Sequence, residues 1–375
     1  MRGIGFLIFL MVPLMLLTEG CGMRGSEGKA MAKEVPADTI PEADFTPNAA
    51  AMADSILKTM TLEEKAAQVL IPALYASDDF FTLRAVGQYA REGIGGIMLL
   101  KGDTASAKQI SDSLRLLSRV RPFVAIDAEW GLGMRLKDAP RYPFNSELGA
   151  EATEEGMFGN GATVGAQCRE LGIDMVLGPV VDVATRDSYM GKRSYGDNPE
   201  RVSDLAIAYA KGLESQGVIS VAKHFPGHGA AVGDSHRGKP VIYRNLHELD
   251  SIDLYPFRRY IAEGLTAVMV GHLGVAAVDP ELRPAAVSAP VIRDLLRGDL
   301  GFEGLVLTDA MGMEGSERSG AVEALKAGTD VVLAPVNTRK ELEAIVAAVR
   351  AGELDEAELD RHVYRILLCK MLREA

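Results

Sequence analysis

The sequence predicts an α/β fold in which a single domain forms a (β/α)8 barrel of the TIM type. Short apolar runs rich in β-branched residues alternate with amphipathic segments, a pattern typical of a parallel sheet with crossover helices. An open doubly wound sheet is the alternative, but no glycine-rich phosphate turn follows the first run. The candidate strands match the eight strands of such a barrel and cover residues 68–74, 94–100, 123–126, 175–183, 218–222, 267–270, 305–307 and 330–334.

The segments between these runs carry apolar residues three and four positions apart, which predicts helices with one buried face. In residues 106–117, for example, Ile110, Leu114 and Leu117 share one face. The tail over residues 339–375 is helical in pattern throughout, so we expect it to pack across the barrel. The other clear helical segments are residues 155–171, 199–212 and 249–262.

The first 21 residues have the pattern of a signal peptide. Arg2 precedes an apolar run over residues 4–17, which is interrupted by Pro13 and is shorter than the roughly 20 residues of a membrane span. Residues 18–21 (Thr-Glu-Gly-Cys) resemble a bacterial lipobox. We therefore expect residues 1–21 to be a lipoprotein-type signal and the protein to be exported to the cell envelope, lipid-anchored in the periplasm or at the outer membrane. Plain secretion is the alternative.

Residues 22–48 are rich in Gly, Ser, Pro, Ala and charge and lack periodicity, which predicts a flexible tether. The folded domain is expected over residues 49–375. The net charge of −12 and the lack of a basic stripe argue against a nucleic-acid partner. Cys168 and Cys369 lie in apolar, helix-like segments, so we expect two buried free thiols.

Charged or titratable residues stand at the ends of five candidate strands. Asp127 follows the third strand, and Asp182 ends the fourth. Lys223 and His224 follow the fifth strand. His272 follows the sixth strand and Asp309 the seventh. The carboxyl ends of barrel strands meet at one face, which carries the active site in enzymes of this fold. This coincidence indicates an active site.

Two kinds of chemistry fit this site poorly. His224 and His228 have the spacing of a helical zinc motif, with His236 as a third ligand, but Pro226 and Gly227 between them disfavour a helix. A serine nucleophile would need a Gly-x-Ser-x-Gly turn, which is absent. We expect neither a metal nor an organic cofactor.

Carboxylate chemistry fits better. Asp309 ends an apolar strand and is followed by small residues, so it could act as the nucleophile of glycosyl transfer. The partner must protonate the leaving oxygen and then activate water, and histidine can do both near neutral pH. Asp234 stands two residues before His236 and could orient its ring and stabilise the imidazolium.

A family resemblance becomes specific at this point. The segment 223–229 (Lys-His-Phe-Pro-Gly-His-Gly) with 234–236 (Asp-Ser-His) resembles the signature of glycoside hydrolase family three, in its β-N-acetylglucosaminidase branch. The resemblance covers roughly residues 49–375. One departure is Glu129-Trp130-Gly131, where Glu-Gly-Gly is often found. Other segments match in the same order, namely 126–131 with Arg135, 177–183, 192–196 and 307–311.

The resemblance implies an enzyme that hydrolyses terminal β-linked N-acetylglucosamine from chitooligosaccharides, peptidoglycan fragments or glycans, with retention of configuration. It implies Asp309 as nucleophile, His236 as acid and base, and Asp234 as the partner of His236. The sugar would be bound by Asp127, Arg135, Arg193, Lys223 and His224. A β-glucosidase or β-xylosidase of the same family, or a catalytically silent sugar-binding lipoprotein, is the alternative.

Several of these residues also have a structural interpretation. Asp127 and Arg135 could form a structural pair, and Arg193 could order its loop. Asp182 is interpreted as a structural group at a strand end, and His228 as a residue that holds its loop. Trp130 could stack on a sugar or close a loop. His247 and His362 resemble solvated helix residues.

Overall fold

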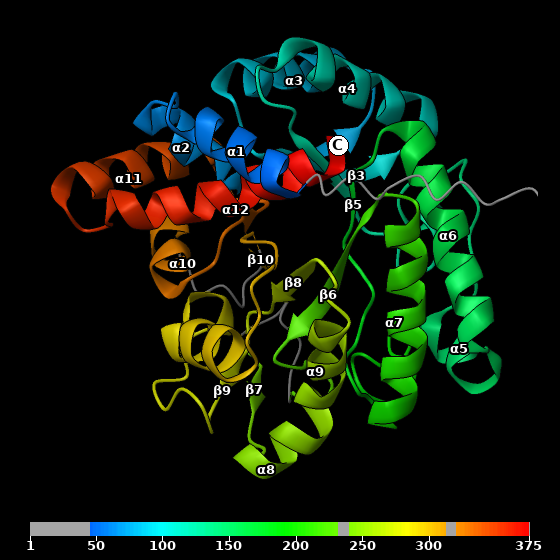
Figure 1. Cartoon of the computed structure of the whole chain (residues 1–375). Coiled ribbons are helices and arrows are strands. Elements are labelled where there is room, and N and C mark those ends of the chain that lie inside the picture. The colour runs from blue at the N-terminus through cyan, green and yellow to red at the C-terminus, as the bar shows by residue number, and fades with distance from the viewer. Residues whose placement is uncertain (1–45, 232–239, 313–319, 375) are drawn as a thin grey trace, which may run out of the picture. The chain divides into compact units, whose positions relative to one another are not determined.

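The computed structural model describes residues 46–231, 240–312 and 320–374 (Figure 1). Its centre is a curled sheet of seven strands, all parallel, in the order β10-β8-β6-β5-β4-β3-β2. The strands are β2 (Ala73–Ala76), β3 (Gly96–Gly102), β4 (Phe123–Ile126), β5 (Met175–Val176), β6 (Ile219–Phe225), β8 (Ala267–Val270) and β10 (Leu305–Thr308). The predicted α/β class is confirmed.

A further parallel pair joins β1 (Leu70–Ile71) to β11 (Val332–Leu333). Val331, next to β11, bridges to Leu307 of β10, and the Thr308 amide donates to the Val331 carbonyl at 2.9 Å. β11 therefore lies beside β10 at one end of the sheet, and β1 directly precedes β2, the strand at the other end, in the chain. The complete eight-stranded barrel stays a prediction. A short parallel pair, β7 (Val241–Ile242) with β9 (Gly274–Val275), was not expected.

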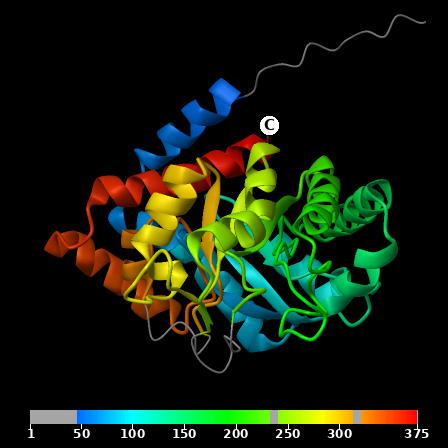
Figure 2. The ribbon, with the colours of Figure 1, turned by 90° about the horizontal axis from the view of Figure 1, so that it is seen from below.

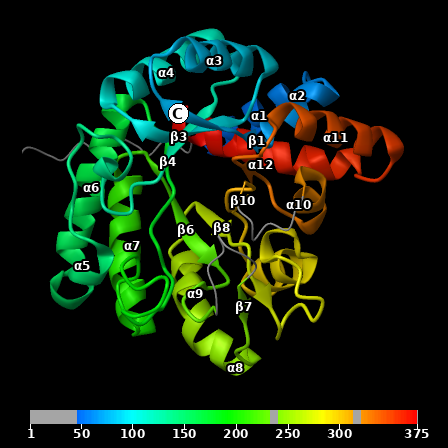
Figure 3. The ribbon, with the colours of Figure 1, turned by 180° about the vertical axis from the view of Figure 1, so that it is seen from behind.

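Helices surround the strands in the views of Figures 1 and 3. The four predicted helical segments are confirmed within a few residues; the last of them is divided into a π-helical segment and α9. The α-helices are α1 (Thr46–Leu57), α2 (Leu62–Gln68), α3 (Phe80–Glu92), α4 (Thr104–Leu117), α5 (Asn145–Glu151), α6 (Glu154–Leu171), α7 (Pro199–Ser215), α8 (Leu246–Glu248), α9 (Leu254–Ala262), α10 (Ala321–Ala327), α11 (Thr338–Ala351) and α12 (Glu356–Glu374). Short 3₁₀ and π segments are η1 (Leu132–Met134), η2 (Leu249–Asp253), η3 (Ala285–Val287) and η4 (Pro290–Asp299).

Local sequence explains where these helices begin and end. The Asp79 carboxylate accepts from the amides of Phe81 and Thr82 at the start of α3, and Gly93 ends that helix with φ of 71°. Gly352, with φ of 74°, likewise ends α11. The tail predicted as one helix is therefore two, α11 and α12, because glycine adopts the left-handed conformation that stops α11.

The tail nevertheless packs as predicted. Figure 2 shows α12, in red, lying across one end of the strands. The Lys370 ammonium donates to the Gln68 side chain at 2.9 Å, which ties α12 to the end of α2. The expectation that His362 is a solvated helix residue is wrong. His362 is buried, and its Nδ1 lies 2.8 Å from the Asp330 carboxylate. Arg297 and Arg365 also pair with Asp330. The buried Asp330 carboxylate, just before β11 in the chain, therefore anchors α12.

The middle strands of the sheet are buried on both faces, and their successive apolar residues belong to different clusters. Phe123 and Ala125 of β4 belong to an inner cluster, whereas Val124 and Ile126 belong to an outer one. Residues two apart on a strand face the same side, so this alternation defines an inward and an outward row on β3, β4, β6, β8 and β10. The inner cluster includes Met98, Phe123, Ala125, Met175, Leu177, Ile219, Val221, Ala267, Met269, Leu305, Leu307 and Leu333.

Two strand predictions change at their ends. The strand predicted over residues 175–183 is interrupted after β5 at Val176, where the Gly178 amide donates back to the Val176 carbonyl at 2.9 Å, and it meets β6 again at the Val180–Lys223 bridge. By contrast, β6 continues through Phe225, so Lys223 and His224 lie in the strand itself. Cys168 and Cys369 are both free and buried, as predicted.

Most of the residues covered by the N-terminal predictions are not described by the structure. Residues 1–45, with the predicted signal and most of the predicted tether, lie outside the described residues. Helix α1 begins at Thr46, inside the range predicted as tether. Among the described residues, no helix has both the length and the apolar character needed to cross a bilayer.

Candidate active site

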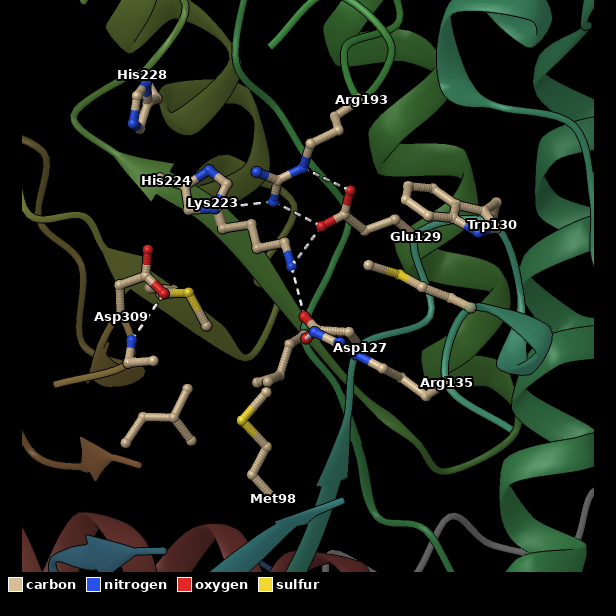
Figure 4. Close-up of a pocket in the computed structure, with 15 residues that line it drawn as sticks. Met98, Asp127, Glu129, Trp130, Arg135, Arg193, Lys223, His224, His228 and Asp309 are labelled. Carbon is tan, nitrogen blue, oxygen red and sulfur yellow. Dashed lines mark hydrogen bonds and ion pairs between the residues drawn. The ribbon is translucent and has the colours of Figure 1, made fainter. Parts of the chain in front are cut away.

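Asp127, Lys223 and Asp309 continue the inward rows of three strands. Each stands two positions beyond an inward-facing apolar residue of β4, β6 or β10. Their side chains therefore converge at the carboxyl end of the sheet, around a cavity of about 300 Å³ (Figure 4). Its wall consists of Met98, Asp127, Glu129, Trp130, Met134, Arg135, Leu177, Arg193, Lys223, His224, His228, Met269, Asp309, Ala310 and Leu333.

Lys223 stands at the centre of an ion-pair network. Its Nζ lies 2.8 Å from Asp127 Oδ1 and 2.8 Å from Glu129 Oε1, and all three side chains are buried. Burial lowers the pKa of the Lys223 ammonium, but the two carboxylates outweigh burial and raise it. Lys223 is therefore a fixed cation on the cavity wall.

Arg135 reaches Asp127 from the other side. The segment between them turns back at Gly131, whose φ is 82°, and a Cβ there would lie 2.4 Å from the Tyr142 ring. Only glycine fits this turn. The Arg135 guanidinium pairs with Asp127 Oδ2, so Asp127 lies between two cations. The structure thus pairs Asp127 with Arg135, and both also line the cavity.

Arg193 is held by Glu129 in a bidentate contact. Arg193 Nε donates to Glu129 Oε2 at 2.9 Å, and its Nη2 donates to Oε1 at 2.7 Å. The loop that carries Arg193 is anchored by Ser194, whose hydroxyl donates to the Asp182 carbonyl at 2.7 Å. Burial opposes ionisation of Glu129, but Arg193 and Lys223 hold the pKa of its carboxyl below the usual range.

A bulge in β6 brings His224 to the cavity beside Lys223. The pairing with β8 matches Lys223 with Met269, then shifts so that Phe225 matches Val270, which leaves His224 as the extra residue. A bulge of this kind re-aims a side chain. His224 Nδ1 lies 2.7 Å from Asp182 Oδ2, and its Nε2 lies 3.2 Å from Arg193 Nη2.

These contacts occupy both ring nitrogens of His224, which disfavours the metal-ligand interpretation of that residue. Asp182 also accepts through Oδ1 from the amides of His224 at 3.2 Å and His228 at 2.6 Å. Asp182 therefore holds the start of the loop as well as the imidazole. Asp182 has the predicted structural role, and it also contacts His224 directly, a residue predicted to bind the sugar.

Asp309 stands on the opposite wall, partly exposed to the cavity (Figure 4). Its amide donates to the Val270 carbonyl at 2.9 Å, and its Oδ1 accepts from the Ala310 amide at 2.7 Å. Burial raises the pKa of this carboxyl, but the imidazoles of His224 and His272, the Ala310 amide and the Lys223 ammonium together outweigh burial and lower it. Asp309 is thus an ionised carboxylate with a fixed orientation.

His272 lies behind the cavity wall. Its Nε2 is 3.2 Å from the Ala310 carbonyl, and burial lowers the pKa of its imidazole. It supports the segment after Asp309 and does not line the cavity. Trp130 does line it, and its ring also packs edge-on against Phe144 with centroids 5.0 Å apart.

The structure gathers six predicted site residues around one cavity: Asp127, Arg135, Arg193, Lys223, His224 and Asp309. The other two, Asp234 and His236, lie outside the described residues. Glu129 was not predicted as a site residue, although its position two after Asp127 places both on one side of an extended segment.

Known proteins share this sequence and fold. The model of the glycosyl hydrolase family 3 N-terminal domain matches residues 61–369. The beta-hexosaminidase of Neisseria meningitidis serogroup C is 35% identical over 257 residues, covering 64% of this chain and 71% of that protein. The beta-hexosaminidase of Stenotrophomonas maltophilia is 33% identical and covers 64% of this chain and 76% of that protein.

The solved structures agree. A glycoside hydrolase family 3 beta-N-acetylglucosaminidase from a Paenibacillus species superposes with a TM-score of 0.76 at 31% identity. The superposition covers 84% of this chain, which spans 64% of that longer chain. A family 3 glycosyl hydrolase from Mycobacterium smegmatis gives 0.73 at 32% identity, over 84% of this chain and 98% of that one. The chain therefore belongs to glycosyl hydrolase family 3 and is a glycoside hydrolase.

Proposed function

We propose that the protein is an exo-acting β-N-acetylhexosaminidase that releases terminal β-linked N-acetylglucosamine with retention of configuration. One observation carries the proposal: Asp309 is an ionised carboxylate that faces a small cavity together with Asp127, Lys223 and His224. A carboxylate in this setting suits attack on an anomeric carbon. The beta-hexosaminidase relatives at 33–35% identity support the choice of sugar.

The reaction proceeds in two displacements. In the first, an Asp309 oxygen bonds to the anomeric carbon, the bond to the leaving oxygen breaks, and that oxygen takes a proton from His236. In the second, water attacks the same carbon, His236 takes the water's proton, and the ester to Asp309 breaks. Asp234 stabilises the imidazolium that donates the first proton and that forms again in the second displacement. Two inversions give net retention.

The cavity wall opposite Asp309 binds the terminal sugar. A carboxylate, three cations and an imidazole offer acceptors and donors to the ring hydroxyls: Asp127, Arg135, Arg193, Lys223 and His224. The volume of about 300 Å³ suits one sugar ring, which favours release of a terminal unit. The substrates proposed are chitooligosaccharides, peptidoglycan fragments or glycans that end in β-linked N-acetylglucosamine.

Two structural proposals accompany this function. The sheet closes into a (β/α)8 barrel through the β1–β11 pair; the donation from the Val332 amide to the Val69 carbonyl at 2.8 Å supports it, as does the Val331–Leu307 bridge. The protein is exported and anchored to the cell envelope by lipid at Cys21; the sequence of residues 1–21 supports this.

A pair of aryl glycosides tests the activity. Purified protein is expected to hydrolyse aryl β-N-acetylglucosaminide rapidly and aryl β-glucoside poorly, and proton NMR of the first product is expected to show the β-anomer. The Asp309→Ala variant serves as the control for contaminating activity. Equal rates on both substrates would favour the glucosidase or xylosidase alternative. Sugar binding without hydrolysis would favour the silent binding protein.

A leaving-group series tests His236. Its replacement in His236→Ala should slow poor leaving groups far more than activated phenols, because only the former need a proton in the first step. A uniform effect, or none, would exclude His236 as the acid.

A further inference from the structure

His224 lies between two groups of opposite hydrogen-bonding character. On one side is the Asp182 carboxylate, 2.7 Å from Nδ1, and on the other is the Arg193 guanidinium, 3.2 Å from Nε2. An ionised carboxylate can only accept hydrogen bonds, and a guanidinium can only donate them. Each neighbour therefore constrains the proton on a different ring nitrogen.

Both neighbours are fixed. Asp182 is fully buried, and its other oxygen accepts from the amides of His224 and His228, so the carboxylate cannot turn away. Although burial raises the pKa of Asp182, His224 and the hydrogen bonds from its neighbours outweigh burial and lower it. Arg193 is clamped through Nε and Nη2 by Glu129. Asp182 therefore stays an acceptor and Arg193 a donor toward His224.

We propose that Asp182 is a positioning residue that keeps His224 as the neutral tautomer with its proton on Nδ1. Nε2 then carries only a lone pair, on the side that faces Arg193. The opposite tautomer would put two donors, Nε2–H and the guanidinium, within 3.2 Å of each other. The protonated ring would do the same, so His224 is not a proton donor on that side.

This assignment has a consequence for substrate binding, and here it rests on the proposed function. Arg193 and His224 form a donor and an acceptor side by side on the cavity wall. The one lone pair of His224 Nε2 accepts from Arg193, so the imidazole holds the guanidinium in place to donate to a sugar hydroxyl. Asp182 therefore acts through His224 to position Arg193 toward the sugar.

The isosteric variant Asp182→Asn tests the assignment. With its oxygen kept toward the His228 amide, the new amide would donate to His224 Nδ1 and force the proton onto Nε2, against Arg193. Removing one charge-assisted hydrogen bond from the site should lower kcat/KM roughly 10- to 100-fold. Asp174→Asn is the matched control, because Asp174 also accepts from a backbone amide, that of Val124 at 2.9 Å, and pairs with Arg121, but it does not line the cavity.

The readout is ¹⁵N NMR of the full chain labelled at histidine, with the His224 signals identified by their loss in His224→Gln. The wild-type and Asp174→Asn proteins should show a protonated Nδ1 and a bare Nε2, and Asp182→Asn should reverse or mix the two. A protonated Nε2 in the wild type would overturn the proposal, even if Asp182→Asn failed to fold. An unchanged tautomer with unchanged kcat/KM in Asp182→Asn would also overturn it.

The two proposals can fail separately. If the wild type shows the expected tautomer but hydrolyses no aryl glycoside, the proposed function fails and the tautomer assignment stands. If it hydrolyses the N-acetylglucosaminide but carries the proton on Nε2, the opposite holds.

Discussion

Replacing Glu129 with glutamine should destabilise the folded protein more than any exposed Glu→Gln change. The Glu129 side chain is fully buried and accepts three charge-assisted hydrogen bonds, two from Arg193 at 2.9 and 2.7 Å and one from Lys223 at 2.8 Å. Glu129→Gln keeps the shape but removes the charge. Its amide group also presents a donor to one of the two cations.

The magnitude follows from these contacts. A hydrogen bond to a charged group contributes about 1.5–3 kcal/mol and a neutral one about 0.5–1.5, so each of the three should weaken by about 1 kcal/mol. The sum of about 3 kcal/mol agrees with the roughly 3–5 kcal/mol lost when a buried ion pair is broken. The free energy of unfolding should fall by about that amount.

Urea unfolding followed by circular dichroism measures the change. The control is Glu343→Gln in α11, where an exposed glutamate pairs with Arg339 at 3.0 Å, and no measurable change is expected there. The pKa of Glu129 is lowered by folding, so its stabilisation is complete above the unfolded pKa and is lost as pH falls toward the folded pKa. Equal stability of the two variants at pH 7 would refute the reasoning.

Three further changes have distinct expected outcomes. Asp330→Asn leaves the cations around α12 without a buried carboxylate, so urea unfolding should show a loss of about 3–5 kcal/mol; a loss below about 1 kcal/mol would contradict this. Burial raises the pKa of Asp253 to about 7, so wild-type stability should fall as pH rises from the ordinary Asp range to 7, and Asp253→Asn should lack that fall. Identical pH profiles would argue against it. Arg193→Lys cannot reproduce the bidentate contact with Glu129 and should raise KM several-fold, whereas an unchanged KM would mean that Arg193 does not position substrate.

The sequence could predict the sheet and half of the site because both follow from local pattern. Apolar runs located the strands, and the residues that end them, such as Asp127 and Asp309, had to emerge at one face. The alternation along β4 and β10 then decides which of these residues face inward. No pairing between distant residues is needed for this step.

The rest depended on contacts between distant segments. Glu129 and Asp182 became visible as parts of the site only when Arg193 and His224 were placed beside them. His362 is polar and so resembles a solvated helix residue, yet it lies on the buried face of α12, against Asp330. The bulge that turns His224 inward depends on pairing between β6 and β8, which the β6 sequence alone does not contain.

The central claim is that Asp309 forms the covalent glycosyl-enzyme. A 5-fluoro derivative of N-acetylglucosaminyl fluoride should slow the second displacement and trap that ester, which peptide mapping by mass spectrometry can locate. We expect one label per chain, on the peptide that contains Asp309, and none in Asp309→Ala. A label on another carboxylate such as Asp127 or Glu129, or a first product of inverted configuration, would contradict the account.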